Sequence, residues 1–82
     1  MTTSLVQSPQ GLALRIVDIS GGESVRRRLF ALGFNIGDDI ELQAKGILRG
    51  PVLIRNRRTG VTAAVGRGIA QKIVVEVADV KD

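Results

Sequence analysis

The sequence predicts a mainly β domain, a small barrel of about five strands with one short helix inserted after the first strand. Several short segments alternate apolar and polar residues with a period of two, which is typical of strands with one buried face. Glycine and proline separate these segments at short intervals. One stretch instead has helical spacing, because Val25, Leu29 and Leu32 lie at i, i+4 and i+7. Five short strands and one helix are typical of an SH3-like barrel.

The first ten residues predict a loose N-terminal arm, because they are mostly polar and end in Ser8-Pro9-Gln10. Residues 11–82 are then expected to form the single domain. Its first strand covers residues 12–19, where the apolar phase changes between Ile16 and Val17. Such a change predicts a bulge, which would let the strand bend around the barrel.

The predicted helix, residues 22–32, has signals at both ends. Ser20 and Glu23 have the spacing of a capping box, in which each side chain satisfies a free backbone N–H. Gly33 follows the last apolar position and can adopt the left-handed conformation that ends many helices.

Four further segments predict strands, namely residues 38–45, 52–57, 61–65 and 72–77, with a single helical turn at residues 69–71. In the first of them Ile40, Leu42 and Ala44 alternate with polar residues. Phe30 and Phe34 are also expected to be buried. The remaining positions expected inside the barrel are Val25, Leu29, Leu32, Ile40, Leu42, Val52, Ile54 and Ile73.

The residue types exclude most catalytic chemistry. The chain has no histidine, cysteine or tyrosine, so the usual general base, the thiolate nucleophile and most transition-metal ligands are missing. Asp38, Asp39 and Glu41 are close in sequence, but they fit the polar face of a strand better than a metal site. We therefore expect no enzyme activity, no cofactor and no dedicated metal site.

The charge suggests an acidic partner. The net charge is +4, the pI is near 10.7, and nine of the twelve cationic residues are arginine. Nucleic acid, a phospholipid surface and an acidic protein face are all compatible with this. A net charge of this size also serves solubility alone. No run of residues is long and apolar enough for a membrane span, and the absence of cysteine permits a cytoplasmic location.

Two sequence segments are candidates for contact with a partner. Ile47 and Leu48, followed by Arg49, occupy a glycine-flanked loop, where they either form an apolar docking site or fold back over the open end of the barrel. The predicted hairpin carries Arg55, Arg57 and Arg58, which could contact phosphates. Of the three consecutive helix arginines 26–28, Arg28 is the one expected to make a fixed contact.

The order of several motifs resembles the FeoA family, small bacterial accessory proteins of ferrous iron transport. These motifs are Arg28-Leu29, then Leu32-Gly33-Phe34 and Gly37-Asp38 before an alternating strand, then Gly50-Pro51, and finally Ile69-Ala70 before the closing strand. The likeness runs from Gly11 to Val77. The positions that match the family pattern are Leu29, Leu32, Gly33, Gly37, Asp38, Gly50, Pro51 and Ala70.

The resemblance implies a cytoplasmic, non-enzymatic protein that binds the cytoplasmic part of an FeoB-type membrane GTPase transporter. Two alternatives stay open at this point. One is an SH3-like module that binds RNA or DNA through the arginine hairpin. The other is a relative of the barrel domain of iron- or manganese-dependent repressors. Ferrous iron prefers carboxylate and imidazole ligands, and this chain offers only carboxylates, so no tight iron site is expected.

Overall fold

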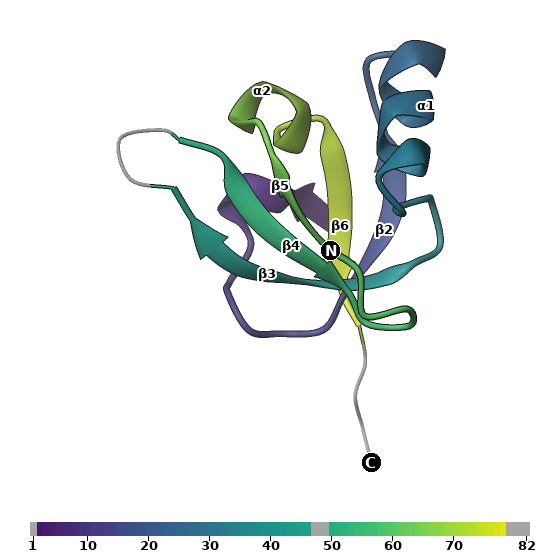
Figure 1. Ribbon diagram of the computed structural model, residues 1–82. Coiled ribbons are helices and arrows are strands. Elements are labelled where there is room, and N and C mark those ends of the chain that lie inside the picture. The colour runs from purple at the N-terminus through teal and green to yellow at the C-terminus, as the bar shows by residue number, and fades with distance from the viewer. Residues whose placement is uncertain (1, 47–49, 79–82) are drawn as a thin grey trace.

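The computed structural model describes residues 2–46 and 50–78, which form one antiparallel sheet of six strands with short helices at its open side (Figure 1). The strands are β1 (Thr2–Ser4), β2 (Leu14–Ile19), β3 (Asp39–Lys45), β4 (Val52–Asn56), β5 (Thr62–Val65) and β6 (Ile73–Val77). The helices are η1, a 3-10 turn (Leu5–Gln7), α1 (Glu23–Ala31) and α2 (Arg67–Ala70). The sheet order is β1-β6-β2-β3-β4-β5, so β1 and β5 are the two edges. The expected mainly β class and the helix between the strands are confirmed.

The prediction of a loose N-terminal arm is wrong, because residues 2–4 form an additional strand, β1. β1 pairs antiparallel with β6, with Thr3 opposite Val75. Leu5 is fully buried in the core, and the Ser8 hydroxyl donates a hydrogen bond of 2.6 Å to its carbonyl oxygen. A polar segment can serve as an edge strand because its pairing uses backbone groups, and a single leucine then fills the end of the core.

The strand pairing shows two shifts in register. The pairing of β2 with β6 shifts between Ile16 and Asp18, which confirms the predicted bulge. A second shift, between Leu42 and Ala44 in the β3–β4 pair, was not predicted. Ala44 is therefore exposed, and the expected alternation of this strand holds only as far as Leu42.

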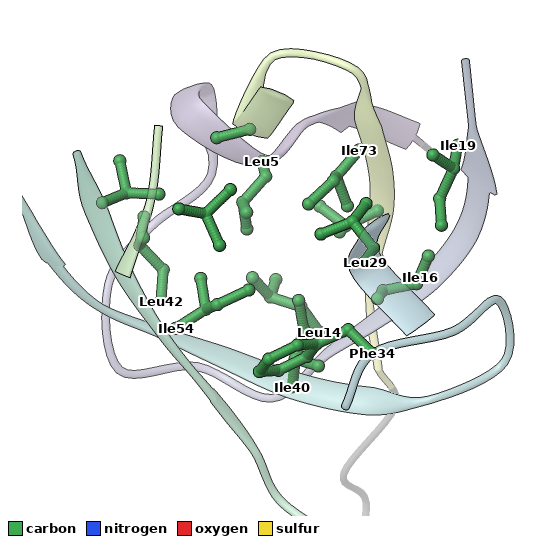
Figure 2. Packing of buried hydrophobic residues seen from close by; sticks show 14 of the residues in the cluster. Leu5, Leu14, Ile16, Ile19, Leu29, Phe34, Ile40, Leu42, Ile54 and Ile73 are labelled. Atoms are coloured by element: carbon green, nitrogen blue, oxygen red, sulfur yellow. The ribbon is translucent and has the colours of Figure 1, made fainter. Parts of the chain in front are cut away.

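The core lies inside the curve of the sheet and is closed on one side by α1 (Figure 2). It is made of aliphatic side chains from every strand except β1 and from α1 and α2, together with Leu5 and one aromatic ring, Phe34. Most of the positions predicted inside are buried, and these are Val25, Leu29, Ile40, Leu42, Val52, Ile54 and Ile73.

The end of α1 explains which aromatic residue is buried. Gly33 has φ +100° and reverses the chain, its N–H donating to the Phe30 carbonyl while the Phe34 N–H donates to the Leu29 carbonyl at 2.9 Å. These two bonds form a Schellman motif. In such a motif the side chains at the positions of Leu29 and Phe34 commonly make an apolar contact. Phe34 is fully buried, as expected.

Two burial predictions for the same region are wrong. Leu32 is 44% exposed and Phe30 is 67% exposed. For Leu32 the physical reason is the reversal at Gly33, which returns the chain so that Phe34 is buried in the core and Leu32 is not. Phe30 directly follows the buried Leu29, so the helix turns its side chain away from the core. Leu32 lies at the C-cap of α1 and faces outward.

The start of α1 also differs from the sequence prediction. Gly22, with φ +89°, is the N-cap, and no side chain among the described residues caps the helix. The Ser20 hydroxyl instead donates to the carbonyl of Lys72, the residue before β6, so the predicted capping box does not form. Glu23 still lies in the first turn, where a negative charge favours the helix dipole.

We predict that Leu29→Ala lowers the free energy of unfolding by about 2–5 kcal/mol, because it leaves a cavity where the helix contacts the core. Urea unfolding followed by circular dichroism measures this loss. Leu32→Ala is the matched control and should cost less than about 1 kcal/mol, since that side chain is already half exposed. Equal losses in the two variants would contradict this account of the helix.

Candidate partner-binding surface

An apolar groove lies between α1 on one side and β5 with the start of α2 on the other. Its volume is about 360 Å³, and its lining is Arg28, Leu29, Ala31, Leu32, Ala64, Val65, Gly66 and Ile69. In Figure 1, α1 and α2 stand on the same side of the sheet, above the strands. Within the described residues β5 is the last strand of the sheet, so no further strand of that part of the chain lies between β5 and the helix.

The groove has a buried floor and an exposed apolar wall. Leu29 is fully buried, whereas Leu32 is large, aliphatic and 44% exposed. Arg28 is the single charged residue of the lining, and no acidic residue belongs to it. A hollow of this kind can take an aliphatic side chain from a partner and place a carboxylate beside the arginine.

Apolar exposure continues around the end of α1. Val61 is 42% exposed and lies against Gly33, where an added Cβ would be 3.2 Å from its Cγ1 atom. Phe30 lies in a second hollow of about 290 Å³, lined also by Gly33, Phe34, Asn35, Asp38, Arg58 and Thr59. We call Phe30, Leu32 and Val61 the helix-end patch. Clustered exposure of large apolar side chains is typical of interaction surfaces.

A polar cluster around the buried Asn56 side chain holds this end of the helix in place. The Asn56 side-chain amide donates to the Gly33 carbonyl at 2.9 Å and to the Asp38 carboxylate at 3.1 Å. Its carbonyl oxygen accepts from the backbone N–H groups of Arg58 and Thr59, at 3.0 and 3.3 Å. Asn56 is fully buried, and these bonds satisfy its amide. It therefore ties the end of α1 to the β4–β5 hairpin.

Asp38 completes the same cluster. Its carboxylate accepts from the Asn35 backbone N–H at 2.9 Å and from the Arg58 guanidinium at 3.4 Å. The second carboxylate of the predicted acidic run, Asp39, instead pairs with Arg15 of β2 at 3.2 Å. Across residues 2–46 and 50–78 no group of three histidine, cysteine, aspartate or glutamate side chains is placed to hold a metal ion.

The predicted contact residues separate into different places. Arg28 lines the groove, whereas Arg55, Arg57 and Arg58 belong to the hairpin and are absent from that lining. Arg55 lies opposite Glu41 in the β3–β4 register, and Arg58 pairs with Asp38. The loop residues Ile47, Leu48 and Arg49 lie outside the described residues, so their role as a docking site stays a prediction.

The expected fixed contact of Arg28 is not found among the residues that the structure describes. Arg26 makes one instead, its guanidinium donating to the Ile19 carbonyl at 3.3 Å and to the Asp18 carboxylate at 3.5 Å. The reason is position on the helix: Arg26 follows the buried Val25 and reaches the end of β2, whereas Arg28 faces the groove.

The other family-pattern positions are structural. Gly37, with φ +95°, donates its N–H to the Ile16 carbonyl at 2.8 Å and so sets the turn before β3. Gly50 and Pro51 directly precede β4, and Ala70 is fully buried in α2. Sequence reasoning missed Asn56, Ala64 and Ile69. Only Asn56 left a signal, since it follows Val52 and Ile54 at the same spacing of two and was therefore an inward polar position.

Fold and surface define a small, SH3-like β domain with an apolar groove beside its helix. Comparison with known families agrees, because the FeoA domain model matches residues 3–77. The chain belongs to the FeoA domain family. No helix in the described part of the chain has the length and apolar character needed to span a bilayer.

Individual relatives are consistent with this assignment. A protein of Methanocaldococcus jannaschii named "Putative Fe(2+) transport protein A" is 33% identical over 75 residues, which are 92% of this chain and 87% of that relative. A crystal structure of an iron uptake regulatory protein (FeoA) has a TM-score of 0.81 and 28% identity, covering 95% of this chain and 99% of the other. The FeoA of Stenotrophomonas maltophilia, titled a prokaryotic SH3 domain protein and complexed with zinc, has a TM-score of 0.68 and 25% identity, covering 93% and 89%.

The fold also occurs inside larger regulators. A manganese-dependent transcriptional repressor matches with a TM-score of 0.83 and 19% identity, and the match covers 94% of this chain but 37% of the repressor. At this identity the likeness concerns the fold alone.

We predict that Asn56→Ala lowers the free energy of unfolding by about 1–3 kcal/mol, because it leaves the Gly33 carbonyl and two backbone N–H groups without partners. Thermal or urea unfolding measures the loss. Asn35→Ala is the control: its side chain accepts one exposed local bond, from the Ile36 N–H, and should cost less than about 1 kcal/mol. An unchanged free energy of unfolding in the Asn56→Ala variant would show that this cluster does not hold the helix end.

Proposed function

We propose that this protein is a non-enzymatic accessory protein of ferrous iron transport. It would act in the cytoplasm by binding the cytoplasmic part of an FeoB-type membrane GTPase transporter. Membership of the FeoA domain family and the name of the Methanocaldococcus jannaschii relative support the iron-transport role. The observation that carries the binding role is the apolar groove with its exposed Leu32 wall.

The groove supports protein binding for a physical reason. Burying apolar surface releases about 25 cal/mol per Å², and Leu32 and the rest of the helix-end patch are left in water in the isolated chain. The hollow is already formed, because the Schellman turn and the Asn56 cluster hold its walls. Little ordering cost then opposes the association.

A nucleic-acid role is less well supported. Two of the three hairpin arginines lie beside carboxylates, Arg58 with Asp38 and Arg55 opposite Glu41, which lowers the positive potential available to phosphates. The scarcity of aromatic rings also weighs against binding of single strands. Phe30 is exposed, however, so one aromatic ring is accessible for stacking on a base.

We predict that Leu32→Ser abolishes or strongly weakens binding to the purified cytoplasmic domain of the FeoB-type transporter from the same organism. An apolar anchor in a preformed hollow supplies interface energy, and a serine hydroxyl there does not. Isothermal titration calorimetry measures the affinity. Leu12→Ser is the matched control, because Leu12 is 45% exposed and does not line the groove.

Three results would contradict this proposal. One is equal binding by Leu32→Ser and the unaltered chain; another is equal loss in the Leu12 control. The third is binding to RNA that weakens, with a flatter salt dependence, when Arg55, Arg57 and Arg58 are changed to glutamine. In that last case the hairpin, and not the groove, would be the functional surface.

We also predict that the isolated protein binds ferrous iron weakly or not at all, so that iron is the cargo of the transporter and not of this chain. The donors available are carboxylates, and those at Asp38 and Asp39 already pair with Arg58 and Arg15. Anaerobic calorimetry with ferrous iron tests this. A stoichiometric, tight site would show the prediction to be wrong.

A further inference from the structure

We propose that the groove takes an extended, acidic segment of the transporter's cytoplasmic part, which adds to the sheet as a strand along the free edge of β5. This inference rests on the proposed function and specifies how the groove recognises its partner. It depends on three features of the described residues: the direction of the β5 backbone groups, the composition of the edge, and the charge of the groove.

The register of the hairpin shows which backbone groups are free. The Asn56 N–H donates to the Val61 carbonyl at 2.7 Å, and along the same pair Ile54 lies opposite Ala63. Successive residues of a strand direct their N–H and C=O groups to alternate sides. Val61, Ala63 and Val65 therefore face β4, whereas Thr62 and Ala64 direct their groups away from it.

The other side of β4 agrees with this register. The Arg57 N–H donates to the Asp39 carbonyl of β3 at 2.8 Å, so residue 57 faces β3 while residue 56 faces β5. Because β5 is the last strand, no strand of the described chain pairs with the outward groups of Thr62 and Ala64.

The β5 edge lacks the features that usually prevent strand addition. Its sequence Thr-Ala-Ala-Val has no charge and no proline, and its pairing with β4 shows no bulge. The opposite edge, β1, is only three residues long and runs directly into η1. Of the two edges, β5 is the better template for a partner strand.

The edge and the groove are one surface, because Ala64 belongs to both. A strand paired with Ala64 runs along the groove opening, and every second side chain of it points toward the lining. The exposed wall at Leu32 and the apolar Ile69 then receive an aliphatic side chain. Backbone pairing supplies affinity in such complexes, and the groove supplies specificity.

The charge of the lining identifies the chemistry of the segment. Arg28 is its one charged residue, and no ion pair to Arg28 occurs within residues 2–46 and 50–78. The chain as a whole carries a net charge of +4. An aspartate or glutamate next to the aliphatic anchor would therefore complete the contact.

The decisive variants are Thr62→Pro and its control Thr62→Val, each titrated with the purified cytoplasmic domain. Proline removes the outward N–H and places its ring in the path of an added strand, whereas valine keeps the N–H and the branched shape. We expect Thr62→Pro to weaken binding about tenfold or more and Thr62→Val to bind like the unaltered chain. Equal affinities for both would overturn strand addition.

Hydrogen exchange in the unaltered chain is a second test, which does not depend on how the proline variant folds. We expect the Thr62 and Ala64 amides to exchange fast in the free protein and to become protected in the complex. Continued fast exchange in a saturated complex would overturn the proposal. Protection in the free protein at high concentration, accompanied by dimer formation, would make the occupant a second copy of the chain and would overturn it as well.

The charge is tested by Arg28→Gln against Arg27→Gln. Arg27 lies on the same helix but does not line the groove, and its guanidinium is 4.0 Å from the Glu23 carboxylate. We expect only the Arg28 variant to weaken binding and to reduce its salt dependence. Equal behaviour of the two variants would contradict the acidic segment.

The outcomes separate this inference from the proposed function. Suppose that Leu32→Ser loses binding, Thr62→Pro binds normally, and the Thr62 and Ala64 amides of the unaltered chain stay unprotected in the complex. The groove then binds the transporter without strand addition. If neither variant affects binding, both proposals are wrong.

Discussion

The hydrogen bonds of the buried Asn56 side chain are the constraint on which the shape of the groove and the helix-end patch depends. One buried amide joins the end of α1, the turn before β3 and the β4–β5 hairpin, through Gly33, Asp38 and the backbone of Arg58 and Thr59. A buried amide is costly unless its bonds are made, so these three segments can adopt only arrangements that satisfy it. Because α1 and β5 form the two walls of the groove, the hydrogen bonds of Asn56 also fix the shape of the groove.

The second determinant is the reversal at Gly33. This reversal returns the chain under the helix, so Phe34 is buried and Leu32 stays outside. Leu32 then lies across the groove from β5. The exposed leucine is thus a consequence of how the helix ends, and not of weak packing. Leu32 and the β5 edge, which no described strand pairs with, form one apolar surface beside Arg28, the charged residue of the groove lining. Such a surface is suited to protein contact.

Much of the fold could be predicted from local pattern. The spacing of Val25 and Leu29 predicted the buried face of the helix, and that of Val52 and Ile54 predicted the inner face of β4. The phase change after Ile16 predicted the bulge in β2. The candidate site was less predictable. Arg28, part of the Arg28-Leu29 motif, was predicted as a partner contact and lines the groove, but that role stays a prediction. Ala64 and Ile69 carry no signal of their own, since they meet α1 only when distant segments come together.

The sequence by itself determined the mainly β class, the place of the helix, the resemblance to the FeoA family and the absence of histidine and cysteine chemistry. These follow from residue type and spacing, which act locally. Only the tertiary structure decided that residues 2–4 form an edge strand, that Phe34 and not Leu32 is buried, and that Arg26 and not Arg28 is held by β2. Each of these depends on which groups compete for one position in space, and that competition involves segments far apart in the chain.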